Sequence, residues 1–141
     1  MKSINLPARL EELARLNEFI AAELPAEARG FLGKIELAVE ELLVNISEYA
    51  YRGRTGRAEI GCGTLQTNKG TAFQVTFRDW GEPFDPFTEA SEPDLDGSLD
   101  DRPIGGLGLY LVRSTASVYR YTRDGDTNFV ELSFDLTGEG A

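Results

Sequence analysis

A glutamate and an asparagine lie four positions apart in residues 34–51, where they could act on one substrate. In a helix, Glu41 and Asn45 would share a face, one turn apart. A carboxylate can take a proton, and a carboxamide oxygen can ligate a hard cation. An isolated pair of this kind is most often a solvated polar face. The pair therefore indicates a functional site only in combination with the motifs that follow it in the sequence.

Two glycine-containing turns follow. Asp79-Trp80-Gly81 comes after an apolar strand, where an aspartate most often caps a turn. The run Gly105-Gly106-Leu107-Gly108-Leu109 opens an apolar helix, and its exposed N–H groups beside the positive end of the helix dipole would suit a phosphate. The competing interpretation is a dinucleotide fingerprint, which needs a strand–turn–helix unit at the start of a parallel sheet. This run lies near the C-terminus, which disfavours that interpretation.

Hydrophobic periodicity predicts the elements that position these residues. The central helix carries an apolar stripe of Ile35, Val39, Leu42 and Ile46, which would pack on a sheet. The expected order is an edge strand at 3–6, a helix at 8–23 ended by Pro25, the central helix at 26–51, a hairpin at 57–66 and 71–78, a helix at 104–117, and a hairpin at 118–123 and 127–136 turned by Asp124-Gly125-Asp126.

Composition narrows the function classes. A chain of 141 residues with 41% hydrophobic and 27% charged residues predicts one globular domain spanning residues 1–141. Its net charge of −10 argues against nucleic acid or an anionic membrane as a partner. The start of the chain lacks the hydrophobic stretch of a signal peptide, so we expect a cytoplasmic protein. Cys62, the single cysteine, is expected to be a core residue.

The chain contains no histidine. This excludes histidine-based catalytic triads, histidine-ligated zinc and a phosphohistidine relay within these residues. A complete sensor histidine kinase is therefore excluded. Acid–base chemistry would have to be done by a carboxylate.

The ordered motifs Glu-x-x-x-Asn, Asp-x-Gly and Gly-Gly-x-Gly-Leu resemble the GHKL superfamily, the ATP-binding domain shared by gyrase, histidine kinases and MutL. The extension from Asp79 through Pro83, Phe84 and Asp85 to Pro86 matches the fuller pattern of stand-alone anti-sigma-factor serine kinases. The resemblance implies a Bergerat fold. That fold is a two-layer α/β sandwich whose mixed, largely antiparallel sheet has three helices on one face.

The resemblance also implies ATP and Mg²⁺ as cofactors and assigns roles to particular residues. Glu41 would be the catalytic base, and Asn45 would ligate Mg²⁺. At the adenine, Asp79 would accept the amino group, Gly81 would permit close approach and Phe84 would pack on the base. The phosphates would be held by Gly105, Gly106, Leu107, Gly108 and Leu109, under an acidic lid at about residues 87–104 from which Arg102 would reach the γ-phosphate.

The implied function is an ATP-dependent serine/threonine-protein kinase that acts as an anti-sigma factor and phosphorylates a STAS-domain anti-anti-sigma partner. The resemblance further implies a homodimer and a first helix that helps to bind a sigma factor, for which Arg9 and Arg15 are candidates, although both also suit a solvated face. Tyr49 stands where the family frequently has histidine. Two alternatives are a nucleotide-dependent regulatory binding module without significant kinase activity and an ATP-hydrolysing switch of the gyrase type.

Overall fold

The computed structural model describes residues 1–89, 112–113 and 116–137. In this part of the chain, five strands form one sheet in the order β1-β2-β3-β5-β4, and every pairing between neighbours is antiparallel. The strands are β1 (Lys2–Pro7), β2 (Arg57–Thr67), β3 (Gly70–Asp79), β4 (Val118–Asp124) and β5 (Thr127–Asp135). The predicted edge strand and both predicted hairpins are confirmed.

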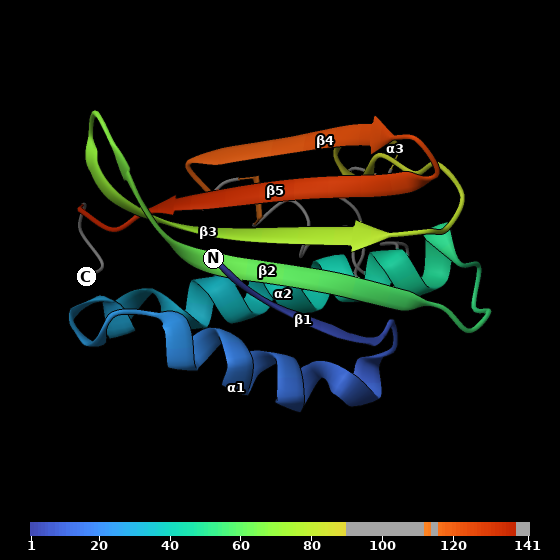
Figure 1. The fold of residues 1–141 in the computed structure, drawn as a ribbon, viewed down its shortest axis with the longest axis horizontal. Coiled ribbons are helices and arrows are strands. Elements are labelled where there is room, and N and C mark those ends of the chain that lie inside the picture. Colours follow the sequence, from blue (N-terminus) through green and yellow to red (C-terminus); the bar gives the residue numbers. More distant parts are fainter. Residues whose placement is uncertain (90–111, 114–115, 138–141) are drawn as a thin grey trace, which may run out of the picture.

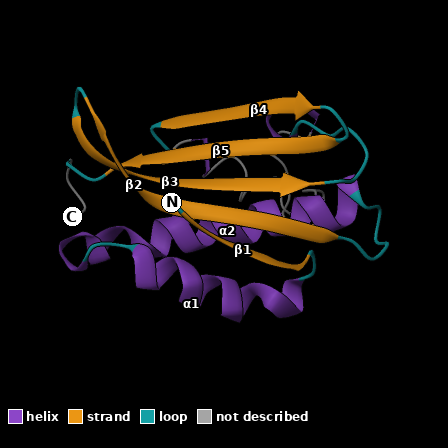
Figure 2. Cartoon of the chain, viewed as in Figure 1, coloured by secondary structure: helices purple, strands orange, loops and turns teal. Residues whose placement is uncertain are grey.

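The helices form a second layer, with α1 and α2 together on one side of the sheet (Figures 1 and 2). The two-layer α/β sandwich expected from the sequence is thus confirmed. The helical elements are η1 (Leu10–Glu12), α1 (Leu13–Glu23), η2 (Ala26–Phe31), α2 (Leu32–Asn45), η3 (Ile46–Ala50) and α3 (Pro86–Glu89). Of the helix expected at 104–117, only Val112 and Arg113 are described as helical.

Two boundaries differ from the expectation. The region 26–51, expected to be one central helix with a first segment loosened at Gly30 or Gly33, consists of a 3-10 segment, an α-helix and a π-helical turn in succession. Gly30 lies in the 3-10 segment, where its low helix propensity favours such a break. The lid predicted at about residues 87–104 begins inside the short helix α3, whose start Asp85 caps by accepting the Phe87 N–H at 2.9 Å.

The core lies between the two layers. The predicted stripe of α2 is buried, with Ile35, Val39 and Leu42 at most 1% exposed. Opposite it, β3 points Phe73 and Phe77 inward. Burial of each such side chain contributes roughly 1.5–3 kcal/mol, so this interface stabilises the position of α2 on the sheet.

The edge strand is joined to its neighbour by a side-chain contact as well as by the backbone ladder. Arg57 on β2 donates from Nε to the Asn5 side-chain oxygen at 2.5 Å and from Nη2 to the Asn5 carbonyl at 3.3 Å.

Cys62 on β2 is fully buried, as expected, and burial raises the pKa of its thiol to about 11. Within the described residues, no helix is both long enough and apolar enough to cross a membrane.

Candidate functional site

Glu41 and Asn45 lie one turn apart on α2, and both are buried, at 8% and 5% exposure. The Asn45 amide nitrogen donates to the Glu41 carbonyl at 2.9 Å. This contact orients the amide, and Asn45 Oδ1 has no hydrogen-bond partner among the described residues. An oriented, unused carboxamide oxygen is a suitable ligand for a hard cation.

The Glu41 carboxyl lies in an environment that disfavours its charge. Burial is the main cause, and the negative charges of Glu40 and Glu48 add to it. Together they raise the pKa of Glu41 to about 7. A carboxyl with a pKa near neutrality is suited to general-base catalysis, because it is available as a carboxylate and yet holds a proton well.

The helix does not end regularly after Asn45. It continues as the π-helical turn η3, closed by the Tyr51 N–H, which donates to the Ile46 carbonyl at 3.0 Å. Turns of this kind occur frequently at functional sites. The Ala50 carbonyl then accepts the Glu82 N–H at 2.8 Å. The end of the helix is thereby bound to the turn that follows Asp79.

Gly81 in that turn is required because the chain passes directly over the helix end. A Cβ at this position would lie 2.6 Å from the Ala50 carbonyl carbon and oxygen. Since those are backbone atoms, no side-chain rotation could relieve the contact. The glycine predicted for approach of a base is thus needed in the first place for packing of the turn on η3.

Replacement of Gly81 by alanine is expected to destabilise the domain by about 1–3 kcal/mol through this overlap. The melting temperature should fall by about 3–10 °C in a chain of this size. Thermal melts would measure it, with Gly33→Ala as the control, because a Cβ at Gly33 meets nothing within 4 Å. An unchanged melting temperature for Gly81→Ala would contradict this account.

Asp79 ends β3 with a buried carboxylate that is 3% exposed. Its Oδ1 accepts the Gly81 N–H and the Asn128 amide, each at 2.9 Å. Its Oδ2 has no hydrogen-bond partner in the described part of the chain. Burial raises the pKa of Asp79, although the two hydrogen bonds and the nearby Arg123 oppose the rise. The carboxylate therefore presents one free acceptor oxygen at the edge of the core.

Asn128 holds this turn together and was missed in the sequence. Besides Asp79, its amide donates to the Glu82 carbonyl at 2.8 Å. Its Oδ1 accepts from the Phe84 N–H at 3.1 Å and the Tyr121 hydroxyl at 2.6 Å. One signal could have revealed it. Asn128 occupies an inward position of the alternation Asn128, Val130, Leu132, Phe134, where β5 is otherwise apolar.

Asn45, Asp79 and Asn128 line one small pocket between α2 and the sheet, whereas Glu41 and Gly81 are not part of its lining. Its polar groups are Asn45, Asp79 and Asn128, and its apolar lining comes from Leu42, Ile46, Ala50, Phe77, Phe84, Pro86 and Val130. Its volume is only about 10 Å³, which is close to the space of a single water. The predicted adenine site would therefore admit a purine only if a side chain of this lining moved.

Phe84 is the side chain best placed to move. Its ring stacks on Tyr49 at a centroid distance of 4.8 Å and an interplanar angle of 13°. Tyr49 is 40% exposed, so outward movement of the pair would meet little resistance from the core. Tyr49 does not itself line the pocket, but it contacts Phe84, which does.

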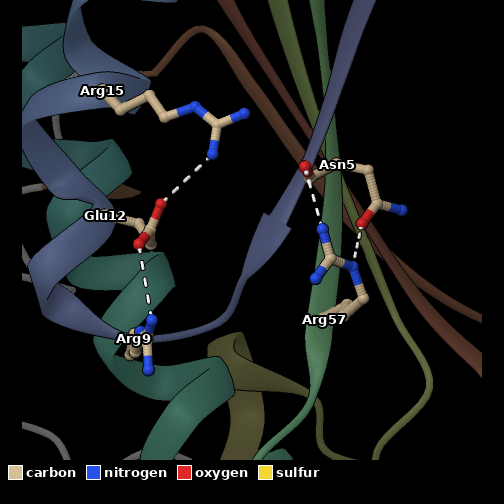
Figure 3. A network of polar contacts seen from close by, with 5 residues as sticks. All are labelled: Asn5, Arg9, Glu12, Arg15 and Arg57. Atoms are coloured by element: carbon tan, nitrogen blue, oxygen red, sulfur yellow. Dashed lines mark hydrogen bonds and ion pairs between the residues drawn. The ribbon is translucent and has the colours of Figure 1, made fainter.

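The remaining predicted residues are not part of this pocket. Arg102 and the run Gly105, Gly106, Leu107, Gly108 and Leu109 lie outside the described residues, and their assigned roles stay predictions. Arg9 and Arg15 are on the surface, on either side of Glu12, at 3.8 and 3.4 Å (Figure 3). Both are 58% exposed, so the ion pairs contribute little to stability.

Comparisons with known proteins identify the family of the chain. The profile of the histidine kinase-like ATPase domain family matches residues 6–134. A similar solved structure is the histidine kinase domain of the blue-light activated histidine kinase of Erythrobacter litoralis EL346, with 19% identity, a TM-score of 0.49, and coverage of 94% of this chain and 62% of that one. A longer structure of that kinase shows 20% identity, a TM-score of 0.52, and coverage of 92% and 42%.

At such identities the likeness concerns the fold alone. The chain spans less than two thirds of the length of both solved structures. The search of curated proteins gave no match.

Proposed function

The chain belongs to the histidine kinase-like ATPase domain family, and from this premise we propose that it is an ATP-dependent serine/threonine-protein kinase acting on a STAS-domain partner as an anti-sigma factor. Membership of the family implies ATP binding. The observation that carries the catalytic part of this proposal is the Glu41 carboxyl, buried one turn from Asn45 and with its pKa raised to about 7. Such a base would serve a serine hydroxyl or a water equally, and the resemblance to anti-sigma-factor serine kinases favours the serine.

The binding half of the proposal assigns the pocket to the nucleotide. Asp79 Oδ2 would accept the adenine amino group, and Asn128 would hold that carboxylate in place through its 2.9 Å hydrogen bond. Asn45 Oδ1 would ligate Mg²⁺. When bound, the ion would neutralise part of the negative charge of the phosphates.

The chemical half assigns proton transfer to Glu41. As the partner's serine oxygen forms its bond to the γ-phosphorus, the hydroxyl proton would pass to the Glu41 carboxylate, and the bond to the bridging oxygen of ADP would break. The acceptor cannot be a histidine of this chain, because the chain has none. A hydroxyl on a second protein is consistent with that composition.

A phosphotransfer assay tests the proposal. The protein, Mg²⁺, γ-labelled ATP and candidate STAS-domain proteins would be incubated, and phosphoamino acids would be identified. Label on a serine of the STAS protein supports the kinase assignment. Release of free phosphate without any labelled acceptor would replace it with an ATP-hydrolysing switch.

A second candidate is favoured by one observation, the narrow pocket lined by Phe84, whose ring stacks on Tyr49. If nucleotide binding chiefly moves these rings, the domain would be a nucleotide-dependent regulatory binding module. Tight ATP binding with no label on any acceptor would establish this alternative.

The pH dependence of phosphotransfer provides a separate prediction. Because Glu41 must be deprotonated to act, kcat/KM should rise with pH through about 7 and level off above it. Glu40→Gln removes one of the charges that raise this pKa, so its profile should shift toward lower pH. Rate measurements between pH 5.5 and 9 would check both, and a flat profile would contradict the assignment of Glu41 as the base.

A further inference from the structure

A second, larger depression adjoins the Asp79–Gly81 turn and has no role in the mechanism above. It has a volume of about 450 Å³, within the range of binding pockets, and it shares Ala50 with the small pocket. We call it the arginine groove, after Arg52, Arg54 and Arg123 in its lining. Among the described residues, Glu82 is the one acidic residue in its lining.

The charge of this groove is opposite to that of the chain. The chain has 14 lysines and arginines against 24 acidic residues, yet three arginines meet here. Arg52 is paired with Glu82 at 2.5 Å. Arg54 is exposed, and its side chain has no partner among the described residues. Among the described residues, the lining of the groove therefore has more positive than negative charge.

One of the three arginines is held in a fixed orientation. Arg123 donates from Nε to the Gly125 carbonyl at 3.2 Å and from Nη1 to the Gly81 carbonyl at 3.0 Å. A further bond from Nη1 reaches Asn128 Oδ1 at 3.2 Å. Its Nη2 has no partner among the described residues, so a preorganised donor remains available to an anion.

The loop that carries Arg52 and Arg54 has a strained backbone at Arg52. Arg52 has a φ of 53°, a left-handed conformation that favours glycine. Gly53 follows with a φ of 77°, and its N–H donates to the Ser47 carbonyl at 2.8 Å. An arginine at the first of these positions is costly to the fold, which points to a use for its side chain.

The groove also has an apolar surface. Trp80 is 45% exposed, and Pro83 lies in the same lining. The Trp80 N–H donates to the Tyr51 hydroxyl at 2.9 Å, which fixes the backbone that carries the indole. An exposed tryptophan beside arginines is the composition typical of protein interaction sites.

We propose that the arginine groove docks an acidic peptide segment of a partner protein, with carboxylates on the arginines and an apolar side chain against Trp80. Charge complementarity argues for this occupant. Nucleic acid is disfavoured because the net charge of −10 would repel its backbone. The proposal does not depend on phosphotransfer, since Glu41, Asn45 and Asp79 are not in the lining of the groove, although Gly81 of the adenine turn is.

Trp80 is the only tryptophan of the chain, so its fluorescence reports on the groove directly. The probe is a capped hexapeptide of four glutamates and two leucines, and the control peptide has glutamine in place of each glutamate. We expect a saturable fluorescence change with the acidic peptide that weakens as salt is added. No saturable change at millimolar peptide, or equal binding of the glutamine peptide, would overturn the proposal.

Two variants sharpen the test. Arg54→Gln should weaken binding about tenfold or more, the usual loss for a charge-assisted contact. The matched control is Arg29→Gln, because η2 lies at the far end of α2 from the loop between η3 and β2 (Figure 1). An equal loss in Arg29→Gln would show that only overall charge matters.

A third variant separates binding from folding. Arg52→Gly relieves the left-handed backbone, so its melting temperature should be unchanged or higher, whereas its peptide affinity should fall. Undiminished affinity in Arg52→Gly and Arg54→Gln together would refute docking at this groove.

Discussion

Replacement of Asp79 by asparagine is expected to abolish ATP binding while the domain stays folded. The asparagine oxygen can still accept the Gly81 N–H and the Asn128 amide, so the turn keeps both hydrogen bonds. Its NH₂ group would replace Oδ2 and meet the adenine amino group, donor against donor. We expect affinity to fall by about two orders of magnitude or more, beyond the loss of one charged hydrogen bond.

Thermal melts with Mg²⁺ and ATP, ADP or GTP would measure this effect. ATP at a hundredfold its dissociation constant should stabilise the wild type by roughly 2.7 kcal/mol, a shift of several degrees. The control is Asp126→Asn, an exposed carboxylate in the β4–β5 turn, which should retain the full shift. An undiminished ATP shift in Asp79→Asn would remove the adenine assignment.

Replacement of Glu41 by glutamine is expected to leave ATP binding intact and to lower phosphotransfer by about 10²–10⁴-fold, the usual contribution of a general base. The structural cost should be small, because glutamine has nearly the same shape. The variant also removes a carboxylate whose charge burial disfavours, so above pH 7 the folded state should be no less stable than in the wild type.

The two effects of Glu41→Gln are separable by assay. ATP-induced thermal shifts report binding, and single-turnover transfer to the acceptor reports chemistry. Glu36→Gln, on the same helix but five residues before Glu41, is the matched control and should retain activity. Unchanged turnover in Glu41→Gln would mean that the base lies elsewhere.

The sign of the pH effect on stability follows from the same residue. The folded-state pKa of Glu41 is raised to about 7 from its ordinary 4.5, so folding is favoured when the carboxyl is protonated. That contribution is complete below about pH 4.5 and is lost as pH rises through about 7. This stability contribution is lost over the same pH range in which activity is expected to rise. The reason is that the ionised Glu41 carboxylate, which destabilises the folded state, is the form that can accept a proton from the substrate.

The sequence by itself determined the features that depend on neighbours along the chain. Glu41 and Asn45 share a helix face because residues four apart must do so. The β4–β5 hairpin follows from Asp124-Gly125, where Gly125 takes the positive φ of 62° that the tight turn requires. The antiparallel arrangement of that pair follows from the short connection.

Only the tertiary structure decided the features that depend on residues distant in the chain. Asn128 reaches Asp79 across 49 positions because β5 pairs with β3. Gly81 is required by contact with Ala50, and the arginine groove joins the loop after η3 to the end of β4. The pKa of Glu41 likewise depends on burial, because solvation of a carboxyl is set by what packs around it and not by its sequence neighbours alone.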